Sequence, residues 1–210
     1  MRIDSRIMQL YAVTDRRWLN GRTLSEAVEE AIAGGVTLVQ LREKELDDAL
    51  FLAEAVELKQ VCHRHGVPLI INDNVEVALK SGADGVHLGQ DDTGIRQARE
   101  ALGEEAIIGA TAHNVEEAVR AEEAGADYLG CGAAFGSATK TDAKPIRLSE
   151  YQEITRAVRI PVAAIGGINR ENIHELAGSG IAGVAVVSGI FAAADIRRAS
   201  EELLAAARKL

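Results

Sequence analysis

The sequence predicts a (β/α)8 barrel, and three observations support this. First, eight short apolar runs recur about every 26 residues, at 8–14, 36–41, 68–71, 85–88, 106–110, 127–131, 161–166 and 183–188. Continuous apolar runs of this length are typical of parallel strands buried on both faces. Second, amphipathic helical patterns lie between the runs, which gives the strand–helix alternation of such a barrel. Third, no Gly-x-Gly-x-x-Gly follows the first run, which disfavours a doubly wound open sheet.

Capping residues indicate where several of the helices begin. Three pairs have the spacing of a capping box: Thr23 with Glu26, Asn114 with Glu117, and Ser149 with Gln152. A longer helix is predicted over 47–66, where Gly66 ends it, and a final helix fills the C-terminus. With strand and helix alternating eight times and no linker between them, we expect one domain over residues 1–210.

The overall composition limits the function. Hydrophobic residues make up 47% of the 210 residues, which is enough for a sizeable core, and aromatic residues make up only 3%, so that core must be aliphatic. The net charge of −9 argues against nucleic-acid binding, which needs a basic surface. Anionic small molecules stay possible ligands, because a few local cations can outweigh a distant acidic surface.

Cysteines and apolar segments indicate the compartment. Cys62 and Cys131 lack metal-ligand spacing, and we expect two buried thiols in a reducing compartment. The uncharged stretch 176–194 approaches the length of a membrane span, but four glycines interrupt it. We interpret it as helix end, turn, strand and turn. The expectation is a cytoplasmic protein without a membrane partner.

Polar side chains gather where the predicted strands end, which is where barrels of this class carry their chemistry. The candidates are Gln40, Arg42 and Lys44 after the second strand, Asn72 and Asp73 after the third, Asp92 after the fourth, Thr111 after the fifth, and Ser137, Thr139 and Lys140 after the sixth. If the second strand persists, Gln40, Arg42 and Lys44 share one face. Glu43 then points the other way, where we expect it to orient or neutralise a neighbour.

The two aspartates favour a metal–diphosphate site. Mg²⁺ is commonly held by one or two carboxylates together with substrate phosphate oxygens. Asp73 and Asp92 follow neighbouring strands, close to the cations Arg42, Lys44 and Lys140, so a site for a cation alone is disfavoured. An alternative stays open, in which these loop acids only cap helices, with Asp91 or Asp92 as the N-cap of the helix that follows the fourth strand.

A second anion site is predicted after strands 7 and 8. The segments "AAIGGIN" and "VAVVSGIF" place glycine-rich backbone there, and barrels often bind phosphate at these loops through backbone N–H groups and a short helix. Among the histidines, His87 is expected to be a hydrogen-bonded core residue. His113 lies at a strand end, where contact with substrate is possible, but we do not expect it to be a general base.

Eight motifs in order resemble the thiamine-phosphate synthase family: "YAVTD", "VQLREK", "IINDN", "GVHLGQDD", "IIGATAH", "DYLGCGAAFGSATKTDAKP", "PVAAIGGI" and "GVAVVSGIF". They extend from Tyr11 to Phe191. The resemblance implies an enzyme that joins a pyrimidine diphosphate to a thiazole phosphate and releases diphosphate. It further implies that Mg²⁺ assists departure of diphosphate and that the thiazole nitrogen captures a pyrimidine carbocation. The protein must then bind the leaving group, exclude water and align the thiazole.

The resemblance also implies roles for individual residues. The segment Gln40, Leu41, Arg42, Glu43 and Lys44 would bind the pyrimidine diphosphate together with Asn72 and Lys140, while Asp73 and Asp92 would hold Mg²⁺. Ser137, Ala138, Thr139, Gly167, Val187 and Ser188 would bind the thiazole phosphate. Arg42, Lys44, Lys140 and Thr111 would be catalytic. Thr111 stands where the family usually has serine, and Phe135-Gly136-Ser137 replaces the usual Phe-Pro-Thr.

Three other functions are compatible with parts of the pattern. A thiazole tautomerase would share the fold and the phosphate site, and a sugar-phosphate isomerase would share only the strand 7–8 phosphate site. A non-catalytic barrel that binds thiamine precursors is the third. The joint presence of Lys44, Asn72, Asp73, Asp92 and Lys140 favours the synthase. A homo-oligomer formed through the outer helices stays open.

Overall fold

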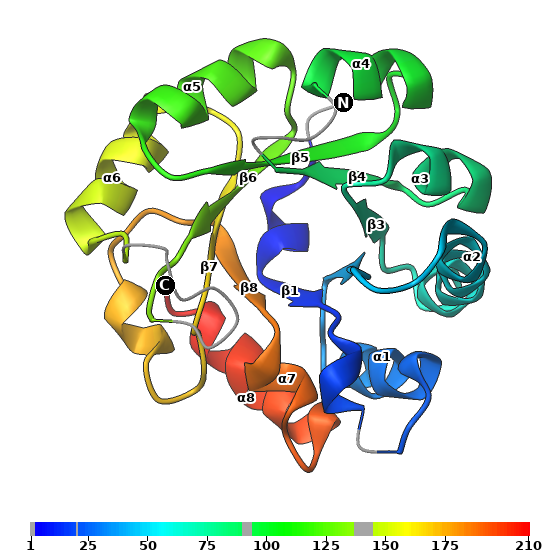
Figure 1. Cartoon of the computed structure of the whole chain (residues 1–210). Coiled ribbons are helices and arrows are strands. Elements are labelled where there is room, and N and C mark those ends of the chain that lie inside the picture. Colours follow the sequence, from blue (N-terminus) through cyan, green and yellow to red (C-terminus); the bar gives the residue numbers. More distant parts are fainter. Residues whose placement is uncertain (1–2, 20, 90–93, 137–144) are drawn as a thin grey trace.

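The eight predicted strands are present and close into one barrel. The computed structural model describes residues 3–19, 21–89, 94–136 and 145–210. The strands are β1 (Leu10–Val13), β2 (Leu38–Leu41), β3 (Leu69–Asn72), β4 (Gly85–Leu88), β5 (Ile107–Ala112), β6 (Tyr128–Gly132), β7 (Val162–Ile165) and β8 (Gly183–Val186). They pair in chain order, all parallel, and β8 pairs with β1. Figure 1 views the barrel approximately down its axis, so that the strands form an inner ring and the helices lie outside it. The predicted barrel is confirmed.

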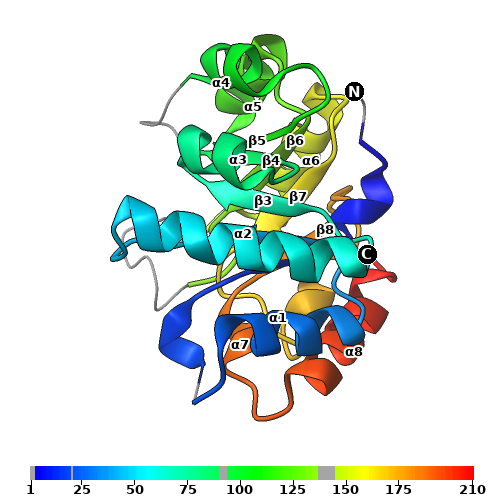
Figure 2. The same cartoon turned by 90° about the vertical axis from the view of Figure 1, so that its right-hand side faces the viewer.

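The helices form the outer layer, which Figure 2 shows from the side. They are α1 (Leu24–Ala33), α2 (Asp48–Arg64), α3 (Val75–Ser81), α4 (Ile95–Leu102), α5 (Val115–Ala124), α6 (Leu148–Ala157), α7 (Ser188–Phe191) and α8 (Ile196–Ala207), with 3₁₀ turns η1 (Ser5–Met8), η2 (Arg16–Trp18) and η3 (Ile173–Leu176). Between β7 and β8 the chain makes only η3, so the seventh of the eight predicted strand–helix units lacks its α-helix. The glycines at 178 and 180 have positive φ, which ends any helix there.

The capping predictions are partly confirmed. Thr23 and Glu26 form the predicted capping box at α1, and Asn114 accepts the Glu117 N–H at α5. The prediction for Ser149 with Gln152 is wrong. Helix α6 begins at Leu148 after the N-cap Arg147, and the Glu150 carboxylate accepts the Arg147 N–H at 2.7 Å, which is the half of a capping box that an arginine N-cap allows. Both Gln152 and Glu150 have a side-chain acceptor, but only Glu150 is three residues beyond the actual N-cap.

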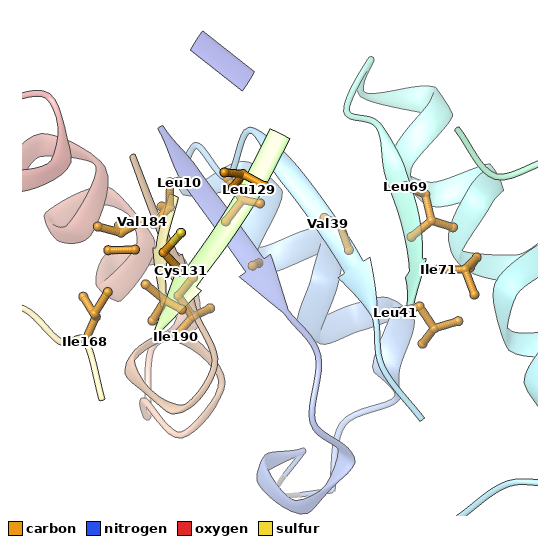
Figure 3. Packing of buried hydrophobic residues seen from close by; sticks show 14 of the residues in the cluster. Leu10, Val39, Leu41, Leu69, Ile71, Leu129, Cys131, Ile168, Val184 and Ile190 are labelled. Atoms are coloured by element: carbon orange, nitrogen blue, oxygen red, sulfur yellow. The ribbon is translucent and has the colours of Figure 1, made fainter. Parts of the chain in front are cut away.

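Apolar packing forms two layers, one on each side of the sheet. Outward-facing strand residues pack against the helices, and Figure 3 shows Leu10, Val39, Leu69 and Val184 among them. Burying each of these side chains stabilises the fold by about 1.5–3 kcal/mol. Inward-facing residues form a second cluster in the lumen, and Met8 of η1 belongs to it. Figure 1 shows η1 across the middle of the ring. Because both strand faces are buried, the strands appear in the sequence as continuous apolar runs.

The uncharged stretch 176–194 contains the end of η3, strand β8 and α7. This agrees with its interpretation as a helix end, a turn, a strand and a further turn. Within the described ranges, no helix combines the length and the apolar character that crossing a membrane would require.

Both cysteines are buried free thiols, as predicted. Burial raises the pKa of Cys62 and of Cys131 to about 12, since the thiolate would lose its hydration. We therefore expect neither thiol to react with an aromatic disulfide reagent at about pH 8 in the native protein, because the thiolate is the nucleophile. In denaturant both should react fully. Rapid release of the coloured thiolate from the native protein would contradict this prediction.

Candidate active site at the carboxyl ends of the strands

Strand β2 delivers Gln40 to the lumen and then ends. Gln40 is 4% exposed, and β2 stops at Leu41, so the strand does not persist to Lys44 as the one-face prediction required. Beyond it, the Arg42 N–H donates to Thr14 Oγ1 at 3.0 Å, which fixes the exit of the β2 loop against the end of β1. Leu41 is fully buried in the outer core, so its side chain faces the helices and not the barrel mouth (Figure 3).

Glu43 supports the loop from behind. Its carboxylate is 3% exposed and accepts from Arg16 Nε at 2.9 Å, while Arg16 also pairs with Glu54 at 2.5 Å. Burial raises the pKa of Glu43, and the Arg16 guanidinium opposes that shift. This agrees with the expectation that Glu43 neutralises a neighbour. The resemblance implied that the Glu43 side chain contacts substrate. In the structure this side chain contacts Arg16 instead.

Cations at this edge differ in whether they are already paired. Arg17 pairs with Asp15, and that guanidinium holds the pKa of the Asp15 carboxyl below its usual range. Arg42 is half-buried and forms no ion pair with any residue that the structure describes. Lys44 Nζ lies 2.6 Å from Asp73 Oδ2. Arg42 is therefore the guanidinium at this edge that stays available to an anion.

Asp73 has an uncommon backbone conformation. Its φ of +64° lies in the left-handed region, which costs a residue with a Cβ about 1–2 kcal/mol. The Asp73 N–H donates to the His87 carbonyl at 2.9 Å, which ties the end of β3 to β4. The carboxylate accepts from Asn72 Nδ2 at 2.5 Å as well as from Lys44. Strain held in place by neighbouring hydrogen bonds is typical of functional sites.

A line of hydrogen bonds crosses the lumen below these residues. Tyr11 and Tyr128 share a hydrogen bond of 2.8 Å, Gln40 Nε2 donates to the Tyr11 hydroxyl, and His87 lies between Tyr128 and Thr111 at 3.0 and 3.1 Å. We call these five residues the lumen chain. The prediction of a hydrogen-bonded core His87 is confirmed. Sequence reasoning missed both tyrosines, although each occupies an inward-facing alternate position of its strand.

Two glycines make room for the lumen chain. A Cβ at Gly109 would overlap the Tyr128 ring and His87 Nδ1, and one at Gly130 would lie 3.0 Å from His87 Cε1. Thr111 belongs to β5, which extends two residues beyond the predicted run because Thr111 and Ala112 pair with β6. His113 follows it, and its ring contacts the Glu117 carboxylate of α5 at 2.9 Å.

The loops after β7 and β8 form the second half of the site. Gly166 and Gly167 have φ values of +108° and +65°, and a Cβ at Gly167 would lie 2.6 Å from the Gly136 carbonyl oxygen. The Phe135 N–H donates to the Gly166 carbonyl at 2.9 Å, so the start of the β6 loop lies against this turn. Val187 caps the short helix α7, which begins at Ser188.

Unpaired backbone donors mark this second half. Across the described ranges, the N–H groups of Gly167, Ser188 and Gly189 have no hydrogen-bond acceptor in the protein. Unpaired N–H groups that converge on one loop pair can bind a phosphate. Five predicted site residues, Ser137, Ala138, Thr139, Lys140 and Asp92, lie outside the described residues. Helix α4 has Gly94 as its N-cap, which argues against the alternative that Asp91 or Asp92 serves there.

Comparisons with known proteins identify the family. A family model described as thiamine monophosphate synthase matches residues 10–190. A thiamine-phosphate synthase of Ruminiclostridium cellulolyticum is 49% identical over 195 residues, which covers 93% of each chain. One from Clostridium acetobutylicum is 49% identical over 189 residues and 90% of each chain.

A solved structure gives the same result. Thiamine phosphate pyrophosphorylase from Pyrococcus furiosus superposes with a TM-score of 0.89 at 39% identity, over 97% of each chain. The structure of 3-hexulose-6-phosphate synthase is 19% identical with a TM-score of 0.65, and that likeness concerns the fold alone. The family and the kind of enzyme expected from the eight ordered motifs are confirmed, and this chain belongs to the thiamine monophosphate synthase family.

Proposed function

We propose that this chain joins an aminopyrimidine methyl diphosphate to a hydroxyethylthiazole phosphate, with thiamine phosphate and diphosphate as products. Family membership and the names of the relatives support the reaction class. The observation that carries the proposal is the cluster at the ends of β2 and β3, where Lys44 and Asn72 converge on Asp73. A thiazole tautomerase handles no diphosphate and has no need of this cluster.

The β2–β3 side would bind the leaving group. Arg42 offers a guanidinium that pairs with no described residue, and Lys44 adds an ammonium whose present partner is Asp73. Charge-assisted hydrogen bonds from such groups are about twice as strong as neutral ones. Asn72 would add an uncharged donor. These three residues would hold the diphosphate from its departure until release, and Lys140 stays a predicted fourth contact.

The residues on this side fit a bound Mg²⁺. Among the described residues there is no group of three or more His, Cys, Asp or Glu side chains that would hold a metal without substrate. Mg²⁺ typically needs only one or two carboxylates when phosphate oxygens and water complete its shell. We assign Asp73 and the predicted Asp92 to that role. When bound, Mg²⁺ would neutralise charge that builds up on the departing diphosphate.

The β7–β8 side would bind the thiazole phosphate. The unpaired N–H groups of Gly167, Ser188 and Gly189 would donate to its oxygens. Asn172 Nδ2 donates to the Gly167 carbonyl at 2.9 Å and so keeps the Gly167 N–H in place. Holding both substrates in one mouth would align the thiazole nitrogen with the reacting carbon.

Between the two anion sites, the chain would support a reaction without a strong base. In the proposed mechanism the pyrimidine amino group stabilises the cation that forms when diphosphate leaves. The upper end of the lumen chain, Thr111 with His87, would orient the pyrimidine by hydrogen bonding. Exclusion of water would protect the cation until the thiazole captures it.

The proposal predicts product only in the presence of Mg²⁺. Thiamine phosphate should form from the two substrates with Mg²⁺ and should disappear with a chelator, as measured by chromatography of the product. Restored product after excess Mg²⁺ is the control for chelator damage. A folded sample that forms no product with Mg²⁺ would contradict the proposal and favour the tautomerase.

Asp73→Asn should lower kcat by at least about 100-fold, because a carboxylate that holds the metal contributes several kcal/mol to the transition state. Asparagine tolerates the left-handed conformation, so the substitution removes charge without adding backbone strain. Affinity for the thiazole phosphate, measured by calorimetry, should stay within about twofold.

Glu76→Gln is the matched control for the loss of a carboxylate. Glu76 is 72% exposed and, among the described residues, forms an ion pair with Lys80 alone, so its substitution should leave kcat unchanged. Equal losses of kcat and thiazole-phosphate affinity in Asp73→Asn would indicate a collapsed site and would count against the metal role.

Gly167→Ala should raise KM for the thiazole phosphate by about tenfold or more, because the added Cβ lies 2.6 Å from Gly136 O and shifts the phosphate-binding N–H. Gly178→Ala is the control, since Gly178 also has a positive φ, of +79°, but no atom within 4 Å of the added Cβ. Steady-state kinetics that show the same change in both variants would place the phosphate elsewhere.

A further inference from the structure

The lumen chain is one uninterrupted line of side-chain hydrogen bonds. It starts at the Gln40 amide on β2, passes through Tyr11 on β1 and Tyr128 on β6, and reaches Thr111 on β5 through His87 on β4. Every link has a partner on a different strand, so closure of the barrel brings the line together. Tyr11 and Tyr128 are 1% and 0% exposed.

Both phenols keep their protons. Burial raises the pKa of Tyr11 and of Tyr128 above the ordinary tyrosine value, because a phenolate in the lumen would lose its hydration. Each tyrosine therefore has one hydrogen to donate and can accept from a neighbour. A buried hydroxyl hydrogen left without an acceptor would be costly, so the hydrogens along the line must be ordered.

The Gln40 amide sets the order. Gln40 Nε2 donates to the Tyr11 oxygen, so the Tyr11 hydrogen goes to the next oxygen, that of Tyr128. The Tyr128 hydrogen then has His87 Nδ1 as its acceptor at 3.0 Å. A neutral imidazole that accepts at Nδ1 carries its proton on Nε2. That proton is donated to Thr111 Oγ1 at 3.1 Å.

We propose that Tyr11, Tyr128 and His87 are positioning residues: they relay the donor direction of the Gln40 amide, fix His87 as the Nε2–H tautomer, and make Thr111 Oγ1 the acceptor of the last hydrogen bond, so that the Thr111 hydrogen is donated away from the line. If the proposed function holds, on which this last step alone rests, a ring nitrogen of the pyrimidine accepts that hydrogen in the substrate complex.

Ligand-free protein labelled with ¹⁵N-histidine tests the order directly. Two-bond ¹⁵N–¹H spectra distinguish the two neutral tautomers and the imidazolium, and His87→Gln assigns the signal. At about pH 8.5, far above the ordinary glutamate pKa, His87 should carry its proton on Nε2. Gln40→Glu should move it to Nδ1, because an ionised carboxylate only accepts and reverses every hydrogen in the line.

Two tyrosine variants show whether the signal travels through the lumen chain. In a Tyr128→Phe background, Gln40→Glu should have no effect on the His87 tautomer, because the line is interrupted. Tyr151→Phe is the matched control: Tyr151 is also fully buried, but its hydroxyl donates to the Cys131 carbonyl in the outer layer. In that background the response to Gln40→Glu should be retained. A proton on Nδ1 in the unsubstituted protein, an imidazolium, or no response to Gln40→Glu in a folded protein would overturn the proposal.

Kinetics test the effect on the reaction. Tyr128→Phe should lower kcat about tenfold, the size of one lost hydrogen bond, with little change in either KM. Tyr128→Phe should have no further effect in a Thr111→Val background and should regain its effect with Thr111→Ser, which restores the hydroxyl. Additive losses would overturn the positioning role. The expected tautomer in a protein without synthase activity would leave the order of the line standing and would refute only the proposed function.

Discussion

The hydrogen bond between Tyr11 and Tyr128 depends on the barrel being closed, and much of the site depends on it in turn. The two residues are 117 positions apart in the chain and meet only because β1 and β6 face each other across the lumen. Their rings fill space that a mostly aliphatic core leaves open, with centroids 5.8 Å apart in an edge-to-face arrangement. Gly109 and Gly130 have no side chain where the Tyr128 and His87 rings lie. The large rings of Tyr128 and His87 thus fit only because Gly109 and Gly130 have no side chains.

The charges of the mouth are distributed around that neutral interior. On the β2–β3 side, Arg16 and Arg17 are bound by Glu43, Glu54 and Asp15, and these pairs hold the loop in place. Among the described charged residues of this edge, Arg42 and the Lys44–Asp73 pair are those that could meet a ligand. A chain with a net charge of −9 can therefore still present cations at one edge, since its acids are used there to fix loops.

The sequence predicted what short-range patterns encode. Eight apolar runs placed the strands, because both faces of each strand are buried. The sequence did not predict the partner of Glu43, which is Arg16, 27 residues away, nor the positive φ of Asp73, which the His87 carbonyl helps to hold. It also left open whether strand β2 persists to Lys44, and the strand ends at Leu41. These features arise from contacts between loops of different units, and such contacts have no local signature. The sequence does show a polar aromatic residue at an inward-facing strand position for both tyrosines of the lumen. That pattern is easily mistaken for an ordinary core residue.

The two sides of the mouth differ in how they would bind an anion, and the difference suits the order of the proposed reaction. Side-chain cations on flexible stems, such as Lys44, can follow a diphosphate as it separates from the pyrimidine. Backbone N–H groups at Gly167 and Ser188 cannot move independently of the β7 and β8 loops, so a phosphate bound there stays fixed. A leaving group needs cations that can move with it. A nucleophile that must meet a short-lived cation needs fixed donors. The lumen chain, with both phenols kept neutral by burial, lies between them and adds hydrogen-bond direction without adding tyrosinate charge. In the proposed reaction the diphosphate that departs and the thiazole that attacks would thus be held by physically different means in a single barrel mouth.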